Sequence, residues 1–135
     1  MHGDGMLTVD DILMPLATAV IIDNKVKKPE LTAFQAQANE LLELFKLEPM
    51  DAAASAEWFD THSKAIKEKL SGPRRNTFVL RILSKFSEDI HVENIFDAMV
   101  QISLSDKEYR REESDLIKSA ASLWGYDRPP VKVTE

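Results

Sequence analysis

Apolar residues recur at intervals of three and four positions along most of the chain, which is the period of an amphipathic α-helix. Six segments show this period, and they cover residues 8–22, 29–45, 52–70, 71–86, 91–104 and 111–124. No segment of β-branched and aromatic residues alternates with polar residues in the manner of a β-strand. The pattern predicts an all-α protein, a compact bundle of about six to seven helices. We expect each helix to turn one apolar stripe toward a shared core, with no helix apolar on all sides.

Several residues indicate where these helices begin, end or bend. Thr8 and Asp51 precede the first and third helices and are suited to N-cap positions. Pro29 fits the first helical position of the second helix, and Gly125 fits the residue that follows the sixth helix. Pro15 lies inside the first helix, where it removes a backbone donor, and it predicts a kink or a split there.

The length and composition indicate one globular domain without covalent cross-links. The chain has 135 residues, 44% of them hydrophobic and 30% charged, which is enough to bury a sizeable core. We assign residues 1–7 to an N-terminal arm, 8–126 to the helical domain and 127–135 to a flexible tail. The chain has no cysteine, which excludes disulfides, cysteine-ligated zinc, iron–sulfur clusters and thiol catalysis.

The charge and hydropathy patterns argue against two classes of partner, nucleic acids and lipid membranes. The net charge is −6, from 17 basic and 23 acidic residues, so we expect no nucleic-acid partner. The longest apolar stretch, residues 12–22, is too short to span a bilayer and contains Pro15, so we expect no membrane insertion. The first residues lack the basic region and cleavage site of an export signal, and we expect a cytoplasmic protein.

Two connectors repeat one pattern of residue types, 83 positions apart. Residues 23–30 read Asp-Asn-Lys-Val-Lys-Lys-Pro-Glu, and residues 106–113 read Asp-Lys-Glu-Tyr-Arg-Arg-Glu-Glu. In each copy an aspartate follows an apolar helix, an apolar residue comes three positions later, and two basic residues come next. A glutamate follows seven positions after the aspartate, in the first turn of the next helix. Helix–loop–helix units that recur in this way predict a pseudo-symmetric fold.

This doubled pattern resembles the tellurite-resistance TerB-like family, over roughly residues 8–126. The family has all-helical cytoplasmic domains with a signature that occurs twice: Ala-Asp-Gly, an acidic residue, an aliphatic residue, two variable residues and a helix-starting Glu. The chain matches the aspartate, the apolar position and the glutamate in both copies, and the Leu-Trp-Gly sequence at residues 123–125 is also similar. It differs at Asn24 and Lys107, where the family has glycine, and at Lys25, where the family has an acid.

The resemblance implies a divalent-cation site built from clustered carboxylates. The matching positions are Asp23, Glu30, Asp106, Glu108 and Glu113. A single connector cannot form an EF-hand, because Lys25 and Lys27 stand where the alternate oxygen ligands would be. Two connectors side by side could share one site for calcium, magnesium, manganese or zinc. The alternative is structural: the acids accept backbone hydrogen bonds, favour helix N-termini and pair with the basic residues of the same connectors.

Other candidate residues favour structural roles. His62 and His91 lie on different helices without the spacing of a zinc site, so we expect packing or surface histidines. Trp58 and Trp124 lie on apolar stripes and are expected to anchor the core. The Pro-Arg-Arg sequence at residues 73–75 could recruit an anionic partner, but we expect its arginines to form surface ion pairs with acids of a neighbouring helix.

The sequence contains no recognisable nucleophile–base pair, glycine-rich phosphate loop or nucleophile elbow. We therefore expect that the protein is not an enzyme. The resemblance implies a role in a stress-response or metal-resistance complex, with other proteins as partners. The alternative is a protein-interaction domain of the co-chaperone type without metal binding. A homodimer through apolar residues near the N-terminus, such as Met6, Leu7 and Met14, is also compatible with the sequence.

Overall fold

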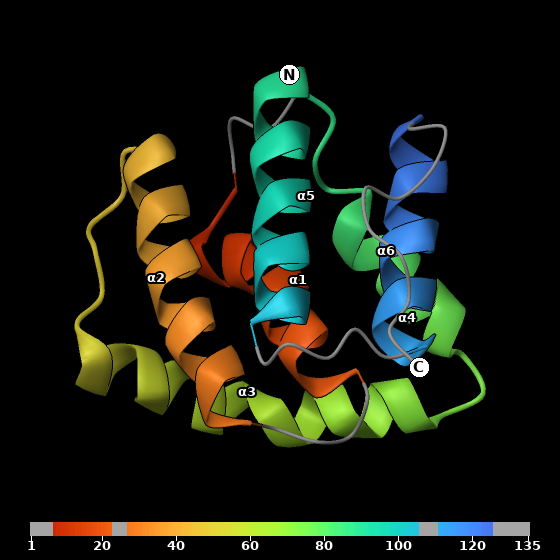
Figure 1. Ribbon diagram of the computed structural model, residues 1–135, viewed down its shortest axis with the longest axis horizontal. Helices are drawn as coiled ribbons and strands as arrows, with labels where there is room; N and C mark the ends of the chain where they lie inside the picture. The colour runs from red at the N-terminus through yellow and green to blue at the C-terminus, as the bar shows by residue number, and fades with distance from the viewer. Residues whose placement is uncertain (1–6, 23–26, 106–110, 126–135) are drawn as a thin grey trace.

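The protein folds into a bundle of α-helices (Figure 1). The computed structural model describes residues 7–22, 27–105 and 111–125. The helices are α1 (Val9–Ile21), α2 (Lys28–Leu44), α3 (Ala52–Ser71), α4 (Arg75–Leu83), α5 (Asp89–Leu104) and α6 (Arg111–Trp124). These described ranges contain six helices and no strand, so the prediction of an all-α protein is confirmed.

The predicted capping residues lie where the helices begin and end. The Thr8 hydroxyl accepts a hydrogen bond from the Asp11 N–H at 3.2 Å, and the Thr8 N–H donates to the Asp11 carboxylate at 3.1 Å, which together form a capping box at the start of α1. Asp51 caps α3 by accepting from the Ala54 N–H at 2.7 Å. Gly125 follows α6 with a φ of +84°, a conformation that glycine adopts without steric cost.

α4 begins later, and α5 begins earlier, than the sequence pattern predicts. α4 begins at Arg75, after α3 has continued through Ser71. α5 begins at Asp89, two positions before the expected His91. The Asp89 carboxylate lies in the first turn, where it interacts favourably with the positive end of the helix.

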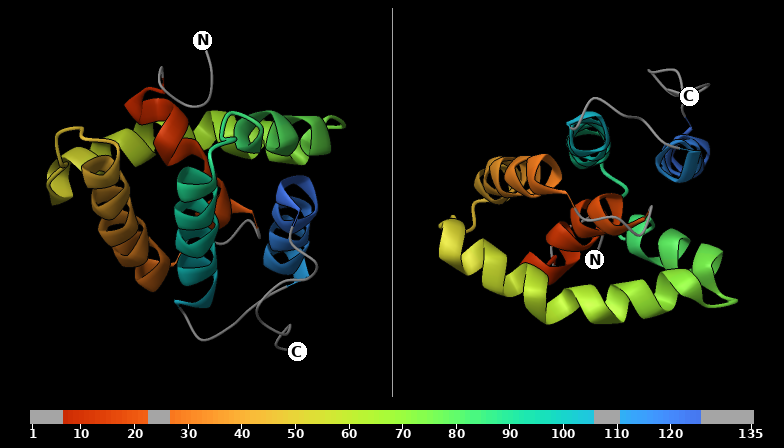
Figure 2. Two further views of the ribbon diagram at one scale, coloured as in Figure 1. Left: turned by 90° about the horizontal axis from the view of Figure 1, so that it is seen from above. Right: turned by 60° about the horizontal axis from the view of Figure 1, so that its bottom comes forward.

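Beyond its first turn, α1 lies at the centre of the bundle and is buried, apart from the half-buried Met14. It contacts α2, α3, α4 and α5, which surround it in Figure 1 and in both views of Figure 2. The side chains in α1 without exposed surface are Ile12, Leu13, Leu16, Ala17, Ala19 and Val20. The expectation that no helix is apolar all round is therefore wrong for α1, because an interior helix has no face turned to water. None of the described helices is long and apolar enough to cross a membrane.

Helix α1 continues through Pro15, so the predicted split does not occur. Proline lacks the N–H that would bond to the carbonyl four residues earlier, that of Asp11. One turn further on, the Thr18 hydroxyl donates to the Met14 carbonyl at 2.8 Å. Pro15 is itself buried, and the packing of four helices around α1 stabilises the helix despite the lost backbone hydrogen bond.

The remaining helices form a shell around α1. α2 and α5 contact each other and stand side by side in Figure 1. α3, the longest helix with 20 residues, contacts α1 and α4, and α6 packs against both α4 and α5. The Phe34 ring of α2 joins the core to α3, since its centroid lies 5.9 Å from that of Trp58 and 5.5 Å from that of Phe59.

The helix boundaries beside the two connectors share one offset in the first and last pairs of helices. α1 ends at Ile21 and α5 at Leu104, while α2 begins at Lys28 and α6 at Arg111, so each boundary recurs 83 positions later. Buried residues recur at the same offset, in the pairs Ile12 and Ile95, Leu16 and Met99, Val20 and Ser103, Phe34 and Ile117, and Ala38 and Ala121. The two helix pairs therefore have connectors of equal length and bury corresponding positions.

We expect Leu16→Ala to lower the free energy of unfolding by about 2–5 kcal/mol, because it removes buried methyl groups and leaves a cavity. Leu80→Ala is the matched control, since Leu80 is 43% exposed, and we expect it to change stability by less than about 1 kcal/mol. Urea unfolding followed by circular dichroism measures both variants. Equal losses in the two variants would contradict the central position of α1.

Candidate functional site

The two glutamates of the repeated pattern lie in the first turns of α2 and α6, as the sequence predicts. Glu30 has 0% of its surface exposed and Glu113 has 1%, whereas every other glutamate in the described ranges is exposed. A carboxylate is seldom buried in a protein unless positive charge or hydrogen-bond donors compensate for its lost hydration. The positive end of each helix supplies part of this compensation.

The structure describes two of the five predicted site residues. The first turns of α2 and α6 lie on the same side of the molecule, and the C-terminal end of α5 lies between them (Figures 1 and 2). Glu30 and Glu113 are therefore placed on one side of the bundle. The other three candidates, Asp23, Asp106 and Glu108, lie outside the described residues.

The donor chemistry of the five predicted residues suits a hard cation. All five are carboxylates, the ligands that calcium, magnesium and manganese prefer. Within the described ranges, no group of three or more histidine or acidic side chains gathers in a way that could hold a metal ion. Calcium and magnesium take six or more oxygen ligands, so Glu30 and Glu113 supply only part of a site, and the remaining oxygens have to come from other carboxylates, backbone carbonyls or water.

A separate polar cluster joins the start of α1 to α3. The indole N–H of Trp58 donates to the Asp10 carboxylate at 2.8 Å, and the His62 ring stacks on the Trp58 ring with centroids 4.1 Å apart. His62 Nδ1 lies 2.8 Å from the Trp58 carbonyl oxygen, and its Nε2 lies 3.7 Å from the Asp10 carboxylate. Trp58 is buried, so its role as a core anchor and the packing role of His62 are confirmed. No sequence signal joins Asp10 to Trp58, because 48 positions separate them.

His91 and Trp124 also contribute to packing. The His91 ring lies against the Phe45 ring with centroids 4.2 Å apart, and its Nδ1 is 3.6 Å from the Glu88 carboxylate. Trp124 is half-buried and meets Phe96 edge to face at 6.3 Å. Trp124 therefore borders the core, whereas Trp58 lies within it.

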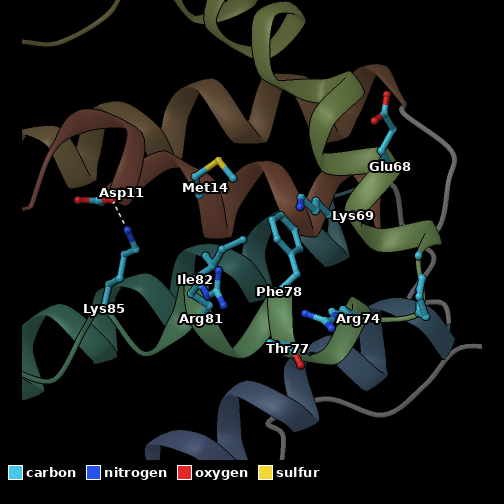
Figure 3. A pocket seen from close by; sticks show the side chains of 12 residues that line it. Asp11, Met14, Glu68, Lys69, Arg74, Thr77, Phe78, Arg81, Ile82 and Lys85 are labelled. Atoms are coloured by element: carbon cyan, nitrogen blue, oxygen red, sulfur yellow. Dashed lines mark hydrogen bonds and ion pairs between the residues drawn. The ribbon is translucent and has the colours of Figure 1, made fainter.

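A groove of about 650 Å³ lies between α1, α3 and α4 (Figure 3), and we call it the basic groove. Its charged lining consists of the basic residues Lys69, Arg74, Arg81 and Lys85 and the acids Asp11 and Glu68. Met14, Phe78 and Ile82 supply apolar surface. The Pro-Arg-Arg sequence points to Arg74, but no local pattern predicts the groove, because α1 is remote in sequence from α3 and α4.

The ion pairs expected for Arg74 and Arg75 do not form with any residue that the structure describes. Of the two acids in the groove, Asp11 of α1 pairs with Lys85 at 2.8 Å and not with an arginine. Figure 3 shows the carboxylate of Glu68 at the rim, directed away from Arg74. Neither acid is therefore placed to neutralise the arginine.

The contact with Lys85 helps to lower the pKa of the Asp11 carboxyl group. Burial acts to raise the pKa of Asp11, but hydrogen bonds from Lys85 and Thr8 and the positive charge of Lys85 outweigh it, so the pKa lies below its ordinary value of 3.8. The pair also ties the first turn of α1 to the segment that follows α4. It thereby closes one end of the basic groove.

The chain matches no protein-family model, no curated protein and no solved structure. The two candidate regions are the buried glutamates of the repeated pattern and the basic groove.

We expect Asp11→Asn to lower the free energy of unfolding at pH 7 by about 0.5–1 kcal/mol, since it weakens the pair with Lys85. A lowered folded-state pKa means that the ionised group stabilises the fold above its unfolded pKa and loses this effect as the pH falls through the folded pKa. The difference between variant and parent should therefore shrink below about pH 4. Urea unfolding at a series of pH values measures this, with Asp97→Asn, an exposed site on α5, as the control. A loss that is constant over the whole pH range would contradict the assignment.

Proposed function

We propose that this protein is a non-enzymatic TerB-like module that acts as a scaffold for other proteins in a stress-response or tellurite-resistance system. Its two helix–connector–helix units together bind one divalent cation, such as calcium, magnesium, manganese or zinc. The ligands are the carboxylates of Asp23, Glu30, Asp106, Glu108 and Glu113. Binding of the cation between the units then regulates the surface that partner proteins recognise.

The observation that carries this proposal is the burial of one glutamate at the same place in each unit. Glu30 and Glu113 both lie in the first turn of a helix, and both are buried, in a chain whose other described glutamates are exposed. The helix boundaries on either side of the two connectors also recur 83 positions apart. Such agreement in position and burial supports a common role for the two glutamates.

The physical argument for a cation is the cost of burying negative charge. Each of the two glutamates loses hydration on burial, so its negative charge has to be compensated by positive charge or by hydrogen-bond donors. A divalent cation provides this compensation, because it supplies two positive charges and takes several oxygen ligands at once. The basic residues of the connectors, Lys25, Lys27 and Arg110 among them, would otherwise have to supply the compensating charge.

Titration calorimetry of chelator-stripped protein with calcium, magnesium, manganese and zinc tests the site. We expect saturable binding of one ion per chain for at least one of these metals. Glu30→Gln/Glu113→Gln should weaken that binding by about tenfold or more, because the amide keeps the shape of the side chain but removes its charge. Asp23→Asn/Asp106→Asn should have the same effect if the connectors contribute ligands.

Glu112→Gln is the matched control, because it removes a charge from an exposed side chain next to Glu113 in the same helical turn. We expect it to leave the affinity for the ion unchanged, and circular dichroism checks that every variant is folded. Binding that is as tight in both double variants as in the parent would remove the carboxylate site. Equal losses in Glu112→Gln would show a response to net charge alone.

A co-chaperone-type interaction domain without metal binding is the second candidate function. It is favoured by a hollow between α4 and α6 that two exposed leucines border together with polar residues, since Leu80 is 43% exposed and Leu123 is 40% exposed. These two leucines offer apolar contact area that a partner protein could cover. Absence of heat with all four metals in the calorimetry would favour this candidate over the cation-binding module.

A further inference from the structure

We propose that the basic groove binds a small organic anion with an apolar body, a fatty or aryl carboxylate being the simplest example. The groove lies between α1, α3 and α4, away from the first turns of α2 and α6 that carry the buried glutamates. The proposal is therefore independent of the cation site. It rests on the charge, the apolar surface and the size of the groove.

Positive charge converges on one part of the groove. Figure 3 shows the nitrogen ends of Lys69, Arg74 and Arg81 around the ring of Phe78, while Glu68 lies at the rim and points away. Within the described part of the chain, none of these three cations forms an ion pair. Arginine guanidinium groups bind carboxylates and phosphates through paired hydrogen bonds, so they suit an anionic head group.

This local excess of positive charge runs against the composition of the protein. The whole chain has a net charge of −6, yet the groove carries four basic side chains against two acids. One of those acids, Asp11, is already held by Lys85 at 2.8 Å. An anion that enters the groove therefore meets three cations, Lys69, Arg74 and Arg81, that form no ion pair with the described residues.

The groove also offers apolar surface that an inorganic anion would not use. Ile82 is buried, and Met14 and Phe78 are half-buried, so their side chains form a floor beneath the charged groups. Apolar floors with a few converging polar groups are typical of sites for small organic molecules. The ligand should therefore carry its charge at one end and an alkyl or aromatic body at the other.

The size of the groove favours a small molecule over a polymer. Its volume of about 650 Å³ lies within the range of about 300–1,000 Å³ that is common for small-ligand sites. Nucleic acid would need a longer basic stripe along its backbone, and the net charge of −6 opposes it. An acidic peptide remains a distinct outcome, which the experiment below separates from a small anion.

Calorimetric titration of the full chain with decanoate tests the proposal. We expect saturable binding of one molecule per chain. Decanol has the same body without the charge, and it should bind at least tenfold more weakly. Butyrate keeps the charge but has a shorter body, and its affinity should fall by about fourfold for each buried methylene that is lost, which corresponds to about 0.8 kcal/mol.

Two variants locate the site. Arg74→Gln/Arg81→Gln should weaken decanoate binding by about tenfold or more, because it removes two charges from the groove. Arg75→Gln is the control, since Arg75 directly follows Arg74 at the start of α4 but borders a different hollow, next to Ile21 and Ile22. We expect Arg75→Gln to leave the decanoate affinity within about twofold of the parent, and circular dichroism checks that both variants are folded.

Several results would overturn the proposal. Absence of saturable decanoate binding would do so, and so would binding of decanol as tight as that of decanoate. Equal losses in Arg75→Gln and in the double variant would assign the effect to net charge rather than to the groove. A polyglutamate peptide that binds where decanoate does not would assign the groove to acidic peptides instead.

Discussion

The burial of α1 beyond its first turn is the constraint that places the other helices. Its side chains present apolar surface in every direction, so α2, α3, α4 and α5 must all pack against it to exclude water. The first turn of this helix carries polar side chains that contact the shell. Asp10 accepts a hydrogen bond from Trp58 of α3, and Asp11 pairs with Lys85, which follows α4. The same turn that caps the central helix therefore also orients two parts of the shell.

Two regions of opposite chemistry follow from this arrangement. The first turns of α2 and α6 bury carboxylates on one side of the bundle, close to the end of α5. The corner between α3 and α4 meets the exposed start of α1 and forms the basic groove. Different helices carry the two regions, so each region can be altered by substitutions in its own helices. A protein of 135 residues can thus combine a candidate cation site with a candidate anion site.

The sequence pattern located the candidate glutamates but not their environment. Helix-start signals and the repeated connector placed Glu30 and Glu113 in first turns, which the structure confirms. Their complete burial depends on how α2 and α6 pack against neighbouring helices, and no local signal records that. For the arginines at the start of α4, the prediction of ion pairs with neighbouring acids is wrong. Acids are abundant in the sequence, but one acid of the groove already binds Lys85 and the other points away, so the expected neutralisation of Arg74 does not occur.

Local chemistry alone was sufficient to predict the helical class and most helix ends. The period of apolar residues, the side-chain caps of Thr8 and Asp51 and the positive φ at Gly125 all involve residues within a few positions of one another. The packing of the helices decided the rest: the burial of α1, its continuity through Pro15, the hydrogen bond from Trp58 to Asp10 and the basic groove. These features depend on segments that are remote in sequence and meet only because the shell must cover an apolar central helix.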